Sequence, residues 1–415
     1  MIPEDWDVST VGHEFDIRLG KMLDAERNVG VPKPYIGNKA VQWDRIDVSN
    51  LPTVPMSRSD IERFRLRKGD LLVCEGGEVG RAALWNAPIE ECYYQKALHR
   101  LRPTRGFDSK LMVALLHQWS NRGLLANYIT QTSIAHLPRE KFLEVPMPVP
   151  PSPEQRAIAT VLSDVDGLLD LLDQLIAKKR DLEQAAMQQL LTGRTRLPGF
   201  HGEWQVRRLG SEIADLEAGV SVNSVEDDLQ SGSGRLAVLK TSAVANGKFI
   251  PSECKTIAQR DLSRVKLSPR AETVIISRMN TIDLVGECGY VPTKFPDLFI
   301  PDRLWMTRLK ASSRVCARWL AFVLSTPGAR RLLRNIATGT SGSMKNIAKG
   351  KFLALEFAFP DPDEQAAIAA VLTDMDAELV ALEQRLAKTR DIKRAMMQEL
   401  LTGKTRLVSS EASHA

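Results

Sequence analysis

The stretch EQRAIATVLSDVD at residues 154–166 returns as EQAAIAAVLTDMD at residues 364–376. The second copy lies 210 positions after the first, and no gap is needed through the closing segments LLTGRTRL (190–197) and LLTGKTRL (400–407). Over the 44 positions that this alignment covers, 26 residues are identical. The chain therefore contains an internal repeat, and its organisation is read from that repeat first.

The repeat continues upstream in weaker form. KFLEVPMPVPPSPEQ (141–155) aligns with KFLALEFAFPDPDEQ (351–365), and EDWDVSTVG (4–12) resembles GEWQVRRLG (202–210) at an offset of 198. The change of offset from 210 to 198 implies a net insertion of 12 residues between two diverged segments. We expect a first variable domain at 1–150, a first long helix at 151–197, a second variable domain at 198–360, a second long helix at 361–407 and a tail at 408–415.

Both repeated segments have the pattern of a long helix that packs along a coiled-coil seam. Pro, Ser or Asp precede Glu154 and Glu364 at the starts, and Gly193 and Gly403 follow the last apolar residues. The predicted seam has alternating spacings of three and four: Ile158, Leu162, Val165, Leu169, Leu172 and Ile176, and Ile368, Leu372, Met375, Leu379, Leu382 and Leu386.

Polar residues interrupt this stripe at Lys179, Glu183, Thr389 and Lys393. The interruption predicts that the seam shifts toward Leu182 and Ile392 in the distal parts.

The charges favour an antiparallel helix pair. Acidic residues occupy the first half of the first helix, and basic residues occupy the second half of the second helix, so antiparallel packing sets acid against base. The residues are Asp164, Asp166, Asp170 and Asp173, and Lys388, Arg390, Lys393 and Arg394. The alternative is two separate helices, each packed on its own variable domain.

The variable domains have a mixed pattern. Short β-rich runs (DLLVC, AVLKT, TVIIS) precede helical stretches at 109–129 and 317–337, and small polar loops follow at 130–136 and 338–346. The predicted fold class is α+β, with two mixed α/β domains separated by two long α-helices that form an antiparallel coiled coil with pseudo-twofold internal repetition.

Composition and charge limit the possible functions. The five cysteines form no CxxC pair, the N-terminus lacks a signal-peptide pattern and no apolar run approaches twenty residues, so we expect a cytoplasmic protein. The net charge is +5, yet segments 154–192 and 364–402 carry −3 and −2, which leaves +10 on the rest. This distribution suits polyanion binding by the variable domains, although ordinary solvated surface also accounts for it.

Motifs for catalysis are missing from the sequence. It has no GxxxxGK[ST] loop, no [DNS]PP[YF] motif, no HExxH and no clustered His/Cys spacing. The pairs Glu253/Lys255 and Asp108/Lys110 match a nuclease pattern only at the level expected by chance, and GGEVG (76–80) lacks dinucleotide-site spacing. We expect no catalytic residue and no metal site.

The helix starts, their repetition and the two LLTG[RK]TRL closers resemble the specificity subunit of type I restriction–modification enzymes. The resemblance covers nearly the whole chain. It implies that each variable domain is a target-recognition domain that reads one half of a bipartite, asymmetric double-stranded DNA site. It also implies that the helices set the spacing and dock two modification (methyltransferase) subunits and the restriction/translocase subunits. S-adenosylmethionine, ATP and Mg²⁺ are then expected on those partners, with no cofactor bound by this chain.

Three stretches of each variable domain are the candidate DNA contacts. Arg suits guanine, and Asn or Gln suits adenine, in the major groove, although a phosphate contact is equally open for each residue. The candidates are Arg45, Glu75, Arg81, Gln131, Thr132, Ser133, His136 and Arg139, and Lys240, Ser277, Arg278, Asn280, Thr340, Ser341, Ser343, Lys345 and Asn346.

Other classes of protein stay open. One is a stand-alone nuclease or methyltransferase. Another is a helical scaffold that binds no DNA. A third is a DNA-binding module of a related methyltransferase-only system. Salt-sensitive DNA binding separates the scaffold from the DNA-binding alternatives, and activity of the lone chain separates the enzyme.

Overall fold

The structure is a computed structural model that describes residues 2–24, 26, 28–131, 135–225, 236–339 and 344–408. The chain divides into two compact units. Unit 1 joins Met1–Gln174 to Gln384–Ala415, and unit 2 is the continuous segment Leu175–Glu383. Each unit therefore contains one mixed domain and a part of each long helix. In the described part of the chain, no helix is long and apolar enough to cross a membrane.

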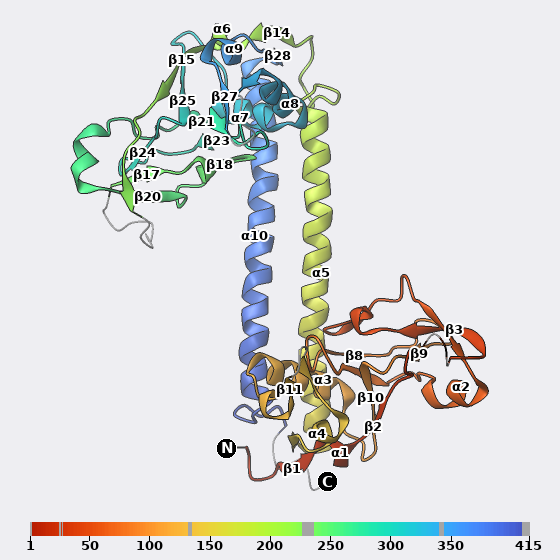
Figure 1. The fold of residues 1–415 in the computed structure, drawn as a ribbon. Coiled ribbons are helices and arrows are strands. Elements are labelled where there is room, and N and C mark those ends of the chain that lie inside the picture. Colours follow the sequence, from red (N-terminus) through yellow and green to blue (C-terminus); the bar gives the residue numbers. More distant parts are fainter. Residues whose placement is uncertain are drawn as a thin grey trace. The chain divides into compact units, whose positions relative to one another are not determined.

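The two long helices are α5 (Ser152–Leu190) and α10 (Pro362–Leu400), each of 39 residues (Figure 1). Both begin and end within a few residues of the expected positions. Gly193 (φ 68°) and Gly403 (φ 70°) follow the last turns in the left-handed conformation that glycine adopts most easily, and they terminate the helices as predicted.

Ion pairs of unit 1 show that α5 and α10 run antiparallel. In unit 1, Asp166 pairs with Lys393 (2.5 Å) and Asp173 pairs with Arg390 (3.2 Å), so residue numbers rise along one helix as they fall along the other. In unit 2, Arg180 pairs with Glu383 (2.6 Å), which is the repeat counterpart of the pair between Arg390 and Asp173, and Lys179 pairs with Glu378 (2.7 Å). The predicted antiparallel coiled coil is confirmed, and the alternative of two separate helices is wrong.

The apolar stripe forms the seam of the helix pair. Val165, Leu169, Met375 and Leu382 are half-buried. The other predicted seam residues are buried: Ile158, Leu162, Leu172, Ile176, Ile368, Leu372, Leu379 and Leu386.

The predicted shift of the seam is wrong. Leu182 (48% exposed) and Ile392 (46% exposed) point to solvent, whereas Glu183 and Lys393 are half-buried and continue the original register. The reason is that long side chains reach polar partners at the seam, as Lys393 does with Asp166. The buried Thr389 likewise donates its hydroxyl to the Arg385 carbonyl (2.8 Å).

One seam position differs in charge between the units. The offset of 210 makes Asp376 the counterpart of Asp166 and Glu183 the counterpart of Lys393. Unit 2 thus sets two carboxyl groups together where unit 1 has an ion pair. Burial and the neighbouring Asp376 raise the pKa of Glu183 to about 7, and Lys248 approaches Asp376 at 2.7 Å.

The repeated Glu of the EQ pair and the repeated Arg of the closers meet in each unit. In unit 1, Arg406 binds both carboxylate oxygens of Glu154 (2.6 Å each) and lies over the ring of Trp6, whose Nε1 donates to Glu154 (2.9 Å). Unit 2 repeats this cluster with Arg196, Glu364 and Trp204. Each closer therefore binds the start of the other long helix.

The repeated Gln fastens each long helix to its mixed domain. Gln155 accepts a hydrogen bond from the Asp108 backbone N–H (2.9 Å) and donates to the Pro150 carbonyl (2.8 Å). In unit 2, Gln365 makes the same two bonds, to Cys316 (3.0 Å) and Pro360 (2.9 Å). These bonds fix the entry of each long helix.

The mixed domain of unit 1 is built on a four-stranded antiparallel sheet in the order β2-β10-β7-β8. Its strands are β2 (Phe15–Leu19), β10 (Leu98–Pro103), β7 (Leu71–Cys74) and β8 (Ala82–Leu84). A second sheet has the order β6 (Thr53–Met56), β3 (Val31–Ile36) and β9 (Tyr93–Tyr94). Two-stranded pairs are β1 (Asp7–Thr10) with β13 (Pro146–Val149), β4 (Val41–Gln42) with β5 (Arg45–Ile46), and β11 (Thr130–Gln131) with β12 (Ala135–His136).

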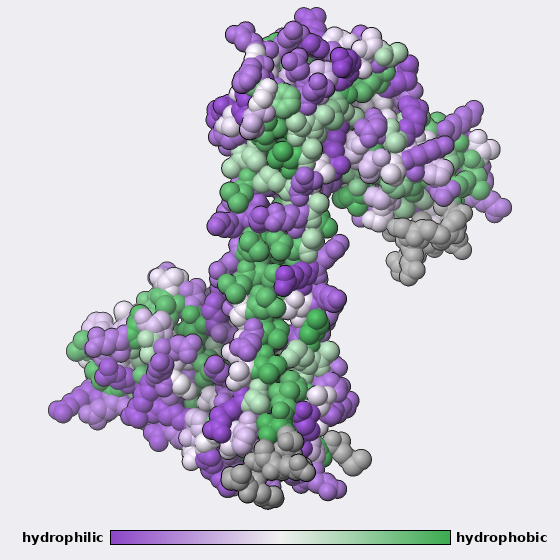
Figure 2. Space-filling model, turned by 180° about the vertical axis from the view of Figure 1, so that it is seen from behind, coloured by the Kyte–Doolittle hydropathy of each residue, from purple (hydrophilic) through white to green (hydrophobic). Residues whose placement is uncertain are grey.

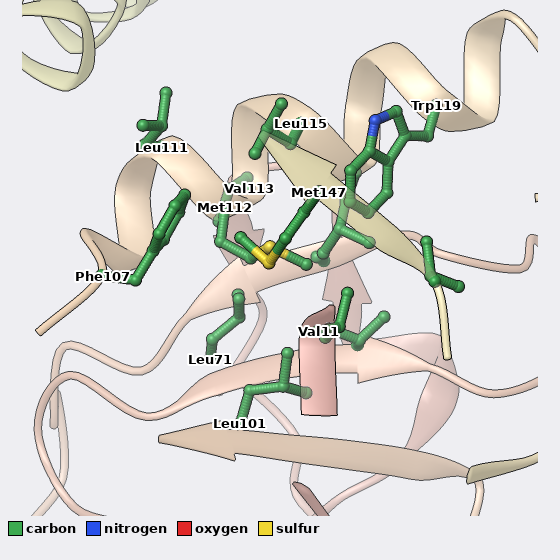
Figure 3. Close-up of a cluster of buried hydrophobic side chains, with 14 of the residues drawn as sticks. Val11, Leu71, Leu101, Phe107, Leu111, Met112, Val113, Leu115, Trp119 and Met147 are labelled. Carbon is green, nitrogen blue, oxygen red and sulfur yellow. The ribbon is translucent and has the colours of Figure 1, made fainter. Parts of the chain in front are cut away.

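Helix α3 (Ser109–Asn121) covers the main sheet of unit 1 and forms its core (Figure 3). Leu111, Leu115 and Trp119 of this helix pack with residues of the sheet such as Leu71 and Leu101. The same core includes α5 and the last turns of α10 through Ile158, Leu162, Met397, Leu400 and Leu401. The smaller helices are α1 (Val11–Glu14), α2 (Arg58–Phe64) and α4 (Arg139–Leu143), with 3-10 turns η1 (Asn38–Ala40) and η2 (Ala126–Tyr128).

The mixed domain of unit 2 has a six-stranded sheet in the order β15-β25-β21-β23-β19-β18. Its strands are β15 (Ile213–Ala218), β25 (Leu304–Leu309), β21 (Thr273–Ser277), β23 (Cys288–Val291), β19 (Gly247–Phe249) and β18 (Val244–Ala245). A second sheet has the order β16 (Ser224–Val225), β20 (Cys254–Ile257), β17 (Ala237–Leu239) and β24 (Leu298–Phe299). The others are β22 (Met279–Asn280), β27 (Lys345–Ile347) and β26 (Ala337–Thr338), and β14 (Gln205–Arg208) with β28 (Glu356–Phe359).

The predicted helical stretches are shorter or broken in the structure. Segment 317–337 forms two helices, α7 (Ala317–Ser325) and α8 (Pro327–Ile336), because Pro327 cannot continue α7 and instead begins α8 behind the N-cap Thr326. Within segment 109–129, helix α3 already ends at Asn121, shortly before Gly123, whose φ is positive (66°). The remaining helices of unit 2 are α6 (Leu209–Glu212) and α9 (Lys349–Leu353), with η3 (Thr241–Ala243) and η4 (Gln259–Arg264).

Candidate nucleic-acid interface

Two of the predicted stretches of unit 1 come together beside the end of β7. We call residues 75–81 together with 130–131 and 135–136 loop pair 1. Gly76 forms a β-bridge with His136, and the Leu137 N–H donates to the Glu75 carbonyl (2.7 Å). A side chain at position 76 would meet the His136 ring at 3.0 Å, so glycine permits this close approach.

Unit 2 repeats the arrangement beside the end of β21. We call residues 278–287 together with 337–339 and 344–347 loop pair 2. Met279 pairs with Asn346 in the β22–β27 ladder, and the Ile347 N–H donates to the Arg278 carbonyl (2.9 Å). The matching bonds make Arg278 the structural counterpart of Glu75, and Asn346 the counterpart of His136. Equivalent positions on one scaffold thus carry different hydrogen-bonding groups.

Two candidate arginines of unit 1 hold its architecture together. Arg81, whose side chain is 14% exposed, donates to the Asn38 carbonyl (3.1 Å) and pairs with Glu78 (3.0 Å). Arg139 donates from Nε to the Ile17 carbonyl (2.8 Å). A base contact by Arg81 or by Arg139 stays a prediction. The bonds that hold these two side chains within the fold do not favour it.

The remaining candidates of unit 1 lie in two places. Glu75 and His136 are half-buried in loop pair 1, where burial raises the pKa of Glu75 and the nearby His136 opposes that shift. Arg45 is exposed on β5, in the hairpin whose Trp43 donates to Glu78 of loop pair 1 (2.6 Å) and whose Asp44 approaches Lys393 of α10 (3.9 Å). Gln131 belongs to β11, and Thr132 and Ser133 lie outside the described residues.

The candidates of unit 2 gather more closely. Arg278 lies over the Trp305 ring (5.4 Å) and Asn280 donates to the Ser277 hydroxyl (3.2 Å), while Ser277 itself is fully buried. Lys345 donates to the Gly339 carbonyl (2.6 Å). Thr340, Ser341 and Ser343 lie outside the described residues.

Two buried polar atoms of loop pair 2 lack a partner within the described part of the chain, Arg278 Nε and Asn346 Oδ1. Buried polar atoms in folded proteins are usually hydrogen-bonded, so these two mark a site where the fold leaves bonding capacity unused. Both belong to candidate contact residues.

The sequence pairs that matched a nuclease pattern have structural roles. Asp108 caps α3 by accepting hydrogen bonds from the Lys110 and Leu111 N–H groups. Glu253 accepts from the Ser242 hydroxyl (2.6 Å) and lies 3.8 Å from Lys240. Neither acid approaches a second carboxylate in a metal-binding group within the residues described.

The comparisons with known proteins first indicate the class of protein. Residues 3–178 match the family model for the type I restriction modification DNA specificity domain. The chain is therefore similar to the specificity subunits of type I restriction–modification enzymes, and the resemblance expected from the repeat is confirmed.

Particular relatives extend the match over nearly the whole chain. The type I restriction enzyme EcoKI specificity subunit of Escherichia coli (strain K12) is 22% identical over 97% of this chain and 89% of its own length. The MjaVIII specificity subunit of Methanocaldococcus jannaschii is 21% identical over 98% and 94%.

A solved structure supports the fold. The S subunit of a type I restriction–modification system from M. genitalium aligns with a TM-score of 0.59 at 15% identity over 96% of both chains. At this identity the likeness concerns the fold alone.

Proposed function

We propose that this chain is the DNA-reading subunit of a type I restriction–modification complex and recognises a bipartite, asymmetric target. The observation that carries the proposal is the duplicated loop pair with exchanged chemistry. Glu75 and His136 occupy the positions that Arg278 and Asn346 occupy in unit 2. A glutamate accepts from cytosine, an arginine donates to guanine and an asparagine binds adenine, so the two units would read different bases.

We also propose that the chain is non-catalytic and acts through partner subunits. Modification subunits would bring S-adenosylmethionine and methylate adenine, and restriction subunits would bring ATP and Mg²⁺. The exposed apolar residues of the helices support docking, because Leu182 and Ile392 are repeat counterparts and are exposed to nearly the same degree. Figure 2 shows such apolar surface on the helices between polar side chains. Equivalent exposed anchors suit one kind of partner that binds twice.

The test uses the purified full-length chain with and without modification subunits and S-adenosylmethionine. The chain alone should bind duplex DNA with a steep dependence on salt, and methylation should require the partners. Robust methylation or cleavage by the chain alone, shown free of partners by mass spectrometry, would contradict the proposal. The second candidate, a methyltransferase-only system, predicts the same methylation with no restriction subunit recovered from cells.

A further inference from the structure

Unit 2 contains a cleft between its second sheet and the start of β25. Its volume is about 410 Å³. Side chains of Lys240, Lys255 and Arg303 line it, together with the hydroxyl residues Ser221, Ser224 and Thr241. Val238 and Leu239 contribute apolar lining.

The cleft has the chemistry of a phosphate site. Three cations face two carboxylates, since Asp302 lines the cleft and Glu253 lies 3.8 Å from Lys240. Hydroxyl groups beside cations are the donors that most often contact phosphate oxygens in DNA complexes. A concave wall with this composition can bind a backbone phosphate at a fixed place.

The cleft adjoins loop pair 2. The Arg278 N–H donates to the Arg303 carbonyl (3.1 Å), which ties the cationic lining directly to a candidate base-reading residue. A phosphate bound by Arg303 would therefore lie close to the bases that loop pair 2 meets.

Unit 1 has the same backbone turn as unit 2, but the position of Lys240 carries no charge there. The Ala243 N–H donates to the Lys240 carbonyl (3.1 Å), and the Ala40 N–H donates to the Gly37 carbonyl (3.0 Å) in the matching turn. Gly37 is therefore the counterpart of Lys240.

The other two cations are replaced as well. The bond from Arg278 to Arg303 corresponds to the bond from the Glu75 N–H to the Ala97 carbonyl (3.0 Å), so Ala97 is the counterpart of Arg303. Lys255 of β20 pairs with Val238 of β17. At the matching place between β3 and β6, the Pro52 carbonyl accepts a hydrogen bond from the Tyr35 N–H, so Pro52 is the counterpart of Lys255. All three cationic positions are thus uncharged in unit 1.

From this contrast we infer that the cleft binds a phosphate of the DNA backbone and that unit 2 anchors the chain on DNA with an electrostatic contact that unit 1 lacks. The inference rests on the proposed function, because it concerns the same DNA. The phosphate contact would increase the affinity of unit 2 for DNA but not its preference for a base sequence, because phosphates carry no base information. Unit 1 then depends more heavily on base contacts for its share of the binding.

The decisive experiment measures binding of the full-length chain to a mixed-sequence duplex at several salt concentrations. The triple variant Lys240→Ala, Lys255→Ala and Arg303→Ala should bind more weakly, and the slope of log K against log salt should fall by about 1, as expected for the loss of one phosphate contact. The control variant Arg194→Ala, Arg208→Ala and Lys351→Ala removes the same charge from exposed residues near the ends of α5, β14 and α9, away from β17 and β20 (Figure 1). It should bind with nearly the wild-type slope.

A gain-of-function variant tests the same idea without removing anything from the cleft. Gly37 has an ordinary backbone conformation (φ −94°), and a side chain there would meet its nearest neighbour at 3.6 Å, so Gly37→Lys with Ala97→Arg should fold. This variant should bind more tightly and steepen the slope by about 1, because one phosphate contact is gained.

The possible outcomes distinguish failure of the proposed function from failure of the phosphate site alone. If the wild-type chain shows no salt-sensitive DNA binding, the proposed function fails. If it binds DNA while the triple variant and the control variant behave alike, the cleft is not a phosphate site and the proposed function stands. Inorganic phosphate that competes with DNA on the wild-type chain but not on the triple variant supports the inference. Phosphate binding with unchanged DNA affinity in the triple variant overturns it.

Discussion

The guanidinium of Arg406 binds the carboxylate of Glu154 through two hydrogen bonds of 2.6 Å, across 252 residues of sequence. Glu154 is 1% exposed, so its charge depends on this partner and on the indole N–H of Trp6. Asp5 binds the same guanidinium at 2.6 Å and 2.8 Å, and these bonds raise the pKa of Arg406. The last segment of the chain thereby stabilises the start of α5.

Arg406→Ala should therefore destabilise unit 1. The loss should be about 2 kcal/mol, less than for a fully buried pair because Arg406 is itself 30% exposed. Chemical unfolding of the full chain measures it, with Lys404→Ala as the control from the same closer. Adding Glu154→Gln to Arg406→Ala should restore part of the stability, because the buried carboxylate is then replaced by a neutral amide. Equal effects of Arg406→Ala and Lys404→Ala would refute the importance of the pair.

Glu183 predicts a pH dependence. Its pKa is 4.5 in an unfolded chain and about 7 in the fold, so between these values the folded state holds the extra proton and stability falls as pH rises. Glu183→Gln should raise the free energy of unfolding at about pH 8 by at most about 1 kcal/mol, given solvent screening. It should also flatten the decline between about pH 5 and pH 8.

The matched control uses the repeat counterpart of Glu183. Lys393→Gln removes the ion pair with Asp166 and should lower stability at about pH 8, where Glu183→Gln raises it. The groups that face Glu183 are Asp376, Lys248 and Arg180. The same sign of change for both variants would contradict the assignment.

Arg278 and Asn346 should determine bases in one half-site only. Replacing either by alanine should relax the preference at one position of that half-site by about tenfold or more, because a bidentate base contact contributes about 1–3 kcal/mol of discrimination. Methylation sequencing of cells that carry each variant reads the result. Glu75→Ala and His136→Ala are the paired variants of unit 1. A change in both half-sites from either set would rule out independent reading.

The helix pair should act as a ruler. One heptad added to each helix, between Leu162 and Leu172 and between Leu372 and Leu382, keeps the seam facing its partner. It adds roughly 10 Å, which corresponds to about three base pairs of spacer. Methylation sequencing should show a longer spacer between unchanged half-sites. An unchanged spacer with full activity would refute the ruler, and so would altered half-sites.

Exchange of residues 1–150 for the corresponding domain of a related protein should change one half-site and leave the other intact. The reason is that each mixed domain has its own core and its own loop pair. The measurement is again methylation sequencing before and after the exchange.

The long helices were predictable from sequence because their pattern is periodic and repeated. Capping residues, the glycines after the last turns and the positions of the seam all follow from local rules. The charges of Asp166 and Lys393 also predicted the antiparallel orientation. The shift of the seam was predicted wrongly because a polar residue such as Glu183 was assumed to leave it, whereas long side chains can stay at a seam and reach partners across it.

The candidate interface was predictable only in outline. The stretches that form each loop pair were named from their composition, and the structure brings them together. That Arg81 and Arg139 are held by the backbone carbonyls of Asn38 and Ile17 was not predictable, because these carbonyls are distant in sequence. Lys255 and Arg303 were missed as DNA contacts because no local pattern marks either of them as a phosphate-binding residue. Only the comparison with Pro52 and Ala97, which requires the strand register, shows that unit 2 has gained charge there.

The discontinuity of unit 1 has a consequence for synthesis on the ribosome. Its core includes Met397, Leu400 and Leu401, and Gln118 of α3 donates to the Met397 carbonyl (3.0 Å). The first domain to emerge must therefore wait, with part of its apolar surface uncovered, until nearly the whole chain has been translated. Unit 2 is continuous and has all its residues once Glu383 has emerged. The usual order of co-translational folding is thus reversed, and a transcript truncated before α10 ends yields a chain that chaperones and proteases can recognise as unfinished.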